Sequence, residues 1–208
     1  MILKERIPTP APEASASYDF QDIEEGVGFV SFRAATTSGS TILTRRSVYS
    51  NTISTIKNPI TGTHAKDIDL DFDTAAFNLP RVLKGTAIIS VPLLVQAGSQ
   101  ATSGYSMVEV KHWDGTTETS LGRSTSGSYL KTSGGGSSQI FSGSQLHKIA
   151  LTEKVFKVGN ILRITVEGYS LDGNGLLEIG HDPQNRNSST TFLSPTELIA
   201  DIPFKLDL

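Results

Sequence analysis

The stretch LIADIPFKLDL, residues 198–208, decides the fold class of this chain of 208 residues. Apolar side chains occupy every even position, and Asp201, Lys205 and Asp207 stand at odd positions between them. A period of two is typical of a β-strand with one buried face, because successive side chains point to opposite faces of a sheet. The closing strand therefore predicts that this end of the chain belongs to the sheet framework and does not fray.

Strand patterns continue through the rest of the chain from residue 18 onward. Residues 68, 70 and 72 are apolar between aspartates, and a longer apolar row from 87 to 95 contains Pro92. Because proline cannot donate to a sheet ladder, Pro92 predicts an edge strand or a bulge. Asp114-Gly115 is typical of a hairpin. Residues 172–175 are typical of a turn that precedes a return strand. No segment sustains the period of 3.6 residues that is typical of a helix.

The number and spacing of these segments predict an all-β fold. We expect an antiparallel β-sandwich with jelly-roll connectivity, formed by a single domain over residues 18–208. The 19 glycines and many polar residues fit a chain of short strands and exposed turns.

Residues 1–17 differ from this domain. Pro8, Pro10 and Pro12 favour an extended arm, because proline fixes φ and removes a donor. Two interpretations stay open: an unstructured leader, or an arm that becomes ordered on a neighbouring subunit. In the second case the predicted contact residues are Ile2, Leu3, Ile7, Pro8, Pro10 and Pro12.

Composition argues against several function classes. The net charge of −3, without a basic run, predicts no nucleic-acid partner. The chain has no cysteine, which removes disulfides, thiolate metal sites and cysteine nucleophiles. Neither a signal peptide nor a membrane-spanning stretch is recognisable, so we expect no membrane partner. If the protein acts outside a cell, we expect it to leave by another route, such as lysis. We also expect no cofactor.

The sharpest polar cluster is an acidic row at alternate positions: Asp67, Asp69, Asp71 and Asp73. Carboxylates on one face of a strand could share a hard cation such as Ca²⁺, which takes oxygen ligands. The simpler interpretation is a solvated face that discourages edge-to-edge pairing, so we predict no metal and keep these residues as candidates.

Aromatic residues supply a second set of candidates. Tyr105, Trp113 and Tyr129 could line a glycan or subunit contact, because aromatic faces stack on sugar rings, or they could pack at strand ends. The loop from His181 to Arg186 predicts a structured turn in which a carboxylate holds Arg186. The four histidines lack ligand spacing and no G-x-S-x-G elbow is present, so we expect no enzyme and no catalytic residue.

Four segments carry a resemblance to a known group of proteins. They are DFDTAAFNLP at 71–80, KGTA at 84–87, HDPQNR at 181–186 and IPFKLDL at 202–208. With them the chain resembles uncharacterised structural proteins from the virions of tailed bacteriophages.

The resemblance implies a non-enzymatic virion protein, most simply a capsid decoration or cement protein. Such a protein would bind the major capsid protein or other virion proteins, stabilise the shell and form a homo-oligomer. The alternative is a head-fibre, tail or receptor-binding module that recognises host surface glycans.

Overall fold

A computed structural model describes residues 27–46, 48–134, 139–186 and 195–205. The predicted all-β fold is confirmed, because these residues form strands and no helix. Among them there is accordingly no helix long and apolar enough to cross a membrane. The predicted arm at 1–17, with all six of its contact residues, lies outside the described residues. The strands are β1 (Val27–Thr37), β2 (Ser40–Thr44), β3 (Ser54–Lys57), β4 (Ala65–Asp73), β5 (Arg81–Gln96), β6 (Ser103–Trp113), β7 (Glu118–Thr125), β8 (Leu130–Lys131), β9 (Ile140–Phe156), β10 (Ile161–Asp172), β11 (Leu176–Gly180) and β12 (Ile199–Lys205).

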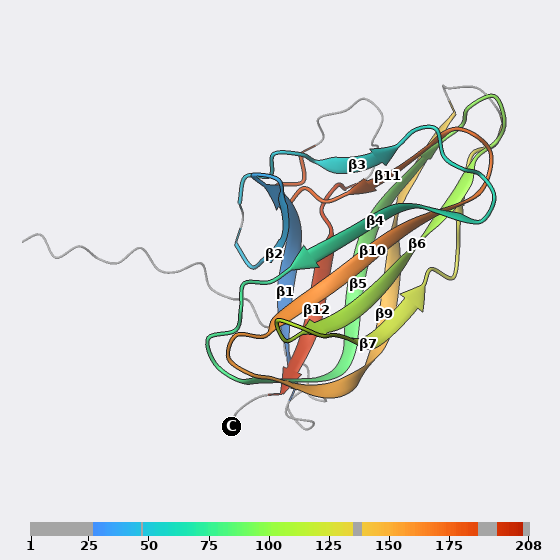
Figure 1. Cartoon of the computed structure of the whole chain (residues 1–208). Coiled ribbons are helices and arrows are strands. Elements are labelled where there is room, and N and C mark those ends of the chain that lie inside the picture. Colours follow the sequence, from blue (N-terminus) through green and yellow to red (C-terminus); the bar gives the residue numbers. More distant parts are fainter. Residues whose placement is uncertain (1–26, 47, 135–138, 187–194, 206–208) are drawn as a thin grey trace, which may run out of the picture.

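The strands form two layers. β4, β10, β6 and β7 make a front layer that crosses a back layer containing β1, β12, β5 and β9 (Figure 1). Nearly all pairs are antiparallel, and the layers are joined by a single parallel bridge between Ile42 of β2 and Asp73 of β4. The buried apolar side chains of both layers meet between them. The antiparallel all-β prediction is therefore correct, and jelly-roll connectivity stays a prediction.

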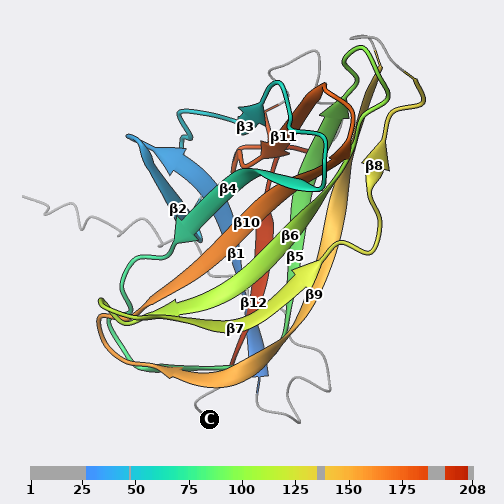
Figure 2. The same cartoon turned by 45° about the vertical axis from the view of Figure 1, so that its right-hand side comes forward.

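The layers come closest where β7 lies over β9, at the side of the molecule turned forward in Figure 2. Gly122 of β7 makes this approach possible. A Cβ atom on Gly122 would lie 2.7 Å from Ile149 Cγ2 and 2.8 Å from the Ala150 carbonyl oxygen. β7 is the edge strand of the front layer and β9 is the edge strand of the back layer. Because they lie against each other, each covers the edge of the other and hinders pairing with a further strand.

The strand that decides the fold lies in the middle of the back layer. β12 pairs with β1 on one side and with β5 on the other. Leu198, Ala200 and Ile202 are fully buried, and Phe204 is 6% exposed. The predicted alternation is observed from Leu198 to Lys205 except at Pro203, an odd position that is also buried where the register against β5 shifts. Residues 206–208 lie outside the described residues.

Two local predictions need correction. Pro92 lies in neither an edge strand nor a bulge, because β5 pairs along its length with β9. On the other side of β5, pairing with β12 ends at Ser90 and pairing with β11 begins at Leu93. Pro92 lies between these two pairings, where the ladder needs no N–H donor. The turn at 172–175 does not lead to a return strand beside β10, because β11 pairs with β3 and β5. The turn therefore carries the chain from the front layer to the back layer.

The predicted hairpin between β6 and β7 is confirmed. The Asp114 carboxylate accepts hydrogen bonds from the backbone N–H groups of Thr116 and Thr117, at 2.9 and 2.7 Å. The Thr117 bond, followed by those from Thr116, lowers the pKa of Asp114 to about 2. Gly115 has a φ of 101°, a region that favours glycine.

Candidate functional site

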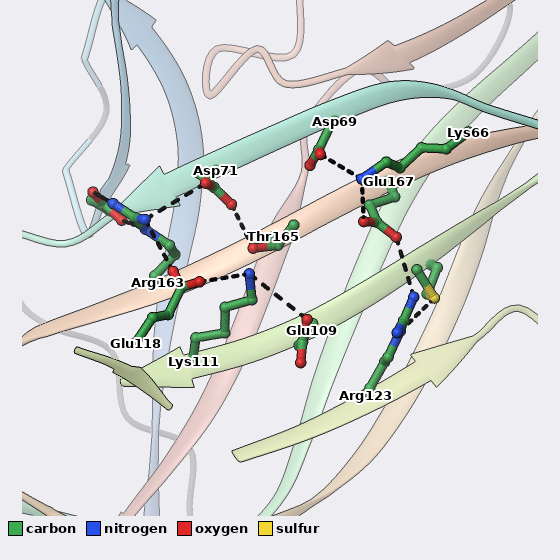
Figure 3. Close-up of polar contacts among 12 residues, drawn as sticks. Lys66, Asp69, Asp71, Glu109, Lys111, Glu118, Arg123, Arg163, Thr165 and Glu167 are labelled. Carbon is green, nitrogen blue, oxygen red and sulfur yellow. Dashed lines mark hydrogen bonds and ion pairs between the residues drawn. The ribbon is translucent and has the colours of Figure 1, made fainter. Parts of the chain in front are cut away.

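The outer surface of the front layer carries a dense array of charged side chains, which we call the charged face (Figure 3). Residues of β6 and β10 alternate, so that one set enters the core and the other points outward. The outward set comes from four adjacent strands, which places distant parts of the sequence side by side. The charged face consists of Lys66, Asp69, Asp71, Asp73, Glu109, Lys111, Glu118, Arg123, Arg163 and Glu167.

Arg163 organises one end of the charged face. Its Nε and Nη2 atoms each donate to an oxygen of Asp73 at 2.7 Å, and Nη1 donates to Glu118 Oε1 at 3.0 Å. Asp71 Oδ2 lies 3.6 Å from the same Nη1 atom. The guanidinium also lies 5.7 Å from the ring centre of Trp113. The bidentate bond to Asp73 raises the pKa of Arg163 above its ordinary value and fixes the orientation of the guanidinium.

Glu167 organises the other end. Its Oε1 accepts a hydrogen bond from Lys66 Nζ at 3.0 Å, and its Oε2 accepts from Tyr169 at 3.0 Å and from Arg123 at 3.4 Å. Lys66 also donates to Asp69 at 2.7 Å, and this bond, followed by that to Glu167, raises the lysine pKa. Burial, and then the bond to Glu167, raises the pKa of Tyr169. The side chains at this end are therefore held in a defined arrangement.

Lys111 extends the Arg163 end of the face across β6. Its Nζ lies 3.1 Å from Glu118 and 3.8 Å from Glu109. Each of the four cations on the charged face is thus paired with at least one carboxylate, whereas six carboxylates are present. The charged face therefore has a net charge of −2 and offers an excess of acceptors to a partner.

The predicted row of four aspartates is broken by a bulge. The register of β4 against β10 shifts between Gly168 and Tyr169, so that Lys66 lies opposite Tyr169 on the charged face. Asp67 instead accepts hydrogen bonds from the Thr61 backbone and hydroxyl, at 3.0 and 2.7 Å, and from Ser170. Asp67 is the extra residue of this bulge, and the alternation of the sequence alone does not predict a bulge. Asp69, Asp71 and Asp73 do share the predicted outer face.

The aspartates are already engaged by neighbouring side chains. Asp69 binds Lys66, Asp71 accepts from Thr165, and Asp73 is taken up by the Arg163 fork. Within the described part of the chain, no group of three or more histidine, aspartate or glutamate residues is arranged to hold a metal ion. The acidic residues therefore serve in ion pairs and hydrogen bonds.

The aromatic candidates lie at both ends of β6. Tyr105 stacks on Tyr169, with ring centres 5.1 Å apart and planes 9° apart, and Trp113 lies under Arg163 at the far end. Tyr129 directly precedes β8, whose Leu130 pairs with Gly104, so the two candidate tyrosines are neighbours in register. Tyr105 and Trp113 are eight positions apart, which corresponds to about 26 Å of strand. The structure therefore brings the tyrosines together but not the tryptophan.

The predicted turn at 181–186 is confirmed, including its arginine. Arg186 donates to both oxygens of the buried Asp182, at 2.9 and 3.2 Å, and to the Ser50 carbonyl at 2.7 Å. Burial opposes ionisation of Asp182, but the bonds from Arg186 hold its pKa below the ordinary value. Tyr49 covers the guanidinium at 4.6 Å. This cluster fixes the loop after β11 to the segment before β3.

A buried serine–histidine contact between the layers was not predicted from the sequence. Ser106 of β6 and His147 of β9 lie with Oγ and Nε2 2.8 Å apart, and both side chains are fully buried. Gln145 accepts hydrogen bonds from Ser106 N and Oγ at 2.6 and 2.7 Å, and itself donates to the Ser128 carbonyl at 2.6 Å. The residues come from strands 41 positions apart, so no spacing rule could find them. A nucleophile must reach its substrate, and this pair has no exposed surface, so it acts as a structural link.

Replacing Arg163 by lysine is expected to lower the free energy of unfolding by about 1 kcal/mol. Lysine keeps the charge but loses the planar fork that binds both oxygens of Asp73. Urea unfolding at low and high salt measures the difference, with Arg46→Lys as the control because Arg46 is exposed and forms no ion pair within the described residues. Equal stability of the two variants would contradict the assigned role of the fork.

Comparisons with known proteins identify the fold. The sequence matches no protein-family model and no curated protein. Two crystal structures of a CocE/NonD family hydrolase from Staphylococcus aureus match 86% and 85% of this chain, with TM-scores of 0.54 and 0.51 and identities of 11% and 10%. An α-amino acid ester hydrolase matches 83% of the chain, with a TM-score of 0.52 and 9% identity. The chain spans only 36–37% of the length of these hydrolases.

These matches contradict the expectation of a non-enzymatic virion structural protein. The three solved structures named above are of hydrolases, so the capsid decoration function and its alternative, a module recognising host glycans, are both corrected. The expectation that the chain has no part in enzyme activity is corrected on the same finding. The resemblance to phage proteins, the virion location and the homo-oligomer stay predictions.

Proposed function

We propose that this chain is the all-β unit of a hydrolase and binds the unit responsible for catalysis through the charged face. One observation carries the proposal: hydrolase structures share this fold over 83–86% of the chain, yet extend well beyond it. The shared fold alone does not assign a reaction.

The composition of the charged face supports a protein contact. Arginine, tyrosine, tryptophan and methionine are enriched in protein interfaces, and the surface contains Arg123, Arg163, Tyr105, Tyr169 and Trp113. The sulfur of the buried Met107 accepts a hydrogen bond from Arg123 Nε at 2.6 Å and so orders this arginine from below. These groups stand on adjacent strands and are already ordered by ion pairs, which reduces the entropy lost on binding.

Charge indicates the kind of surface that fits. With a net charge of −2, the charged face attracts a partner surface with an excess of lysine and arginine. Binding through such charges weakens as salt rises, because exposed charges are screened. The catalytic unit is accordingly expected to present a basic surface to this layer.

The test uses the full chain, tagged and recovered from the cells that make it. We expect hydrolysis of p-nitrophenyl esters and α-amino acid esters to co-elute with the unaltered chain. The double variant Asp69→Lys/Asp71→Lys should lose at least about 90% of the recovered activity, because it places two lysines against a basic partner surface. A loss of about 1.4 kcal/mol of binding free energy lowers the affinity for the catalytic unit tenfold. The matched variant Glu153→Lys/Asp172→Lys changes the net charge equally at two residues that are not among the ten of the charged face, and should retain the activity.

Three results would overturn this proposal. The first is an absence of hydrolysis in the recovered complexes, and the second is equal recovery of hydrolysis with both double variants. The third is hydrolysis by the purified chain alone together with labelling of Ser106 by a fluorophosphonate, which would locate catalysis at the buried serine–histidine contact.

A further inference from the structure

The outer surface of the back layer faces away from the front layer and carries two rows of side chains across three strands (Figure 1). The middle residue of each row belongs to β5, and its register partners lie on β9 on one side and on β12 on the other. We call this set the outer patch. Its first row is Lys148, Ile88 and Asp201, and its second row is Leu146, Ser90 and Ile199.

Strand alternation directs these six side chains away from the core. The residues that alternate with them point inward, and His147, Ile89 and Ala200 are fully buried between the layers. Lys148 and Leu146 are exposed, and the four residues of the patch on β5 and β12 are half-buried. Because Leu146 is 59% exposed, the outer patch presents an apolar side chain to solvent beside a cation.

The two charges of the outer patch lie at its opposite margins. Lys148 on β9 and Asp201 on β12 are separated by β5, which corresponds to about 10 Å at the usual spacing of strands. Asp201 accepts a hydrogen bond from the Ser31 hydroxyl. Among the residues that the structure describes, Lys148 has no carboxylate partner and Asp201 has no cationic partner. Each charge can therefore pair with a group on a second molecule.

The arrangement of the outer patch is complementary to itself. A two-fold axis along β5, in the plane of the contact, places the β9 side of one copy over the β12 side of the other. Lys148 of each copy then faces Asp201 of the other copy, and Leu146 faces Ile199 in the same way. A two-fold interface requires this relation, because each residue that contacts a second residue is contacted by it in return.

We propose that two copies of this chain associate through the outer patch. Leu146, Ile88 and Ile199 of the two copies form the apolar centre of the contact, and two pairs of Lys148 with Asp201 form its margins. The strands of the two copies run in the same direction, as in sheets that pack face to face with aligned strands. The charged face belongs to the opposite layer, so this association leaves it free.

Sedimentation velocity of the full chain at increasing concentration tests the association. We expect a dimer, and we expect Lys148→Glu to weaken it at least about tenfold, because the change creates two like-charge contacts across the axis. Leu146→Gln should weaken it through the apolar centre. The matched control is Lys57→Glu, since Lys57 is exposed but pairs in register with Leu177 and so lies on the other face of the layer. The control should associate like the unaltered chain.

A mixture of two charge variants tests the axis itself. Asp201→Lys alone should also be monomeric, whereas an equal mixture of Lys148→Glu and Asp201→Lys should form a heterodimer. In the mixed dimer the new glutamate faces the new lysine in one contact, and Lys148 faces Asp201 in the other. Circular dichroism checks that each variant is folded.

Three results would overturn the proposal: an unaltered chain that stays monomeric, equal association of Lys148→Glu and Lys57→Glu, or a mixture of folded variants that stays monomeric. The double variant Asp69→Lys/Asp71→Lys alters the charged face alone and should dimerise normally. Loss of the dimer in that variant, with none in Lys148→Glu, would assign self-association to the charged face instead. These readouts do not depend on hydrolase activity, so they stand or fall separately from the proposed function.

Discussion

Lowering the pH from about 7 to about 4 is expected to reduce the free energy of unfolding by about 3 kcal/mol for each of two buried histidines. His147 and His181 are 0% and 1% exposed. Burial lowers the pKa of each to about 4, with weaker opposing effects from Ser124 at His147 and from Asp182 at His181. Urea unfolding at several pH values measures the loss.

The direction follows from proton uptake. Below about pH 6.5 the unfolded chain protonates both imidazoles, whereas the folded chain keeps them neutral until about pH 4. The unfolded state therefore binds more protons over this interval, and stability falls as pH falls through it. Glu178 works in the opposite direction, because burial raises the pKa of its carboxyl and the folded chain takes up that proton first.

Variants separate the histidines from the carboxylates. His147→Gln keeps a polar side chain near Ser106 and should remove about half of the pH-dependent loss. The control is His64→Asn, since His64 is exposed with a φ of 50°, a backbone conformation that asparagine tolerates. An unchanged pH dependence in His147→Gln would show that His147 is not held neutral by burial.

Local patterns in the sequence were sufficient to predict individual strands and turns. The alternation in β12 and the hairpin at Asp114-Gly115 depend on neighbouring residues alone, and both are observed. The turn at 172–175 is also predicted from neighbouring residues, but the predicted pairing of the following strand with β10 is wrong. Pairing of β11 with β5 joins residues about 80 positions apart, and no local signal in one sequence specifies such a pair.

The sites were harder to predict for the same physical reason. Asp69, Asp71 and Asp73 share a face as expected, but their partner Arg163 is supplied by β10, about 90 residues later. The bulge opposite Gly168 removes Asp67 from that face, and no residue type in β4 predicts a bulge there. Ser106 and His147 meet only because β7 and β9 bring the two layers together at that side. Spacing along the chain cannot reveal contacts between layers.

Truncating Ile202 to alanine is expected to lower the free energy of unfolding by about 3 kcal/mol, because the change leaves a cavity as well as losing buried apolar surface. Ile202 is fully buried in the core, on the strand that holds β1 and β5 together. Ile199 provides a control of the same residue type on the same strand, because its side chain faces outward and is only half-buried. Ile199→Ala should cost about 1 kcal/mol or less. Equal losses in chemical unfolding would refute the assignment of the even positions of β12 to the core, since a strand with a period of two cannot bury both faces equally when one meets solvent.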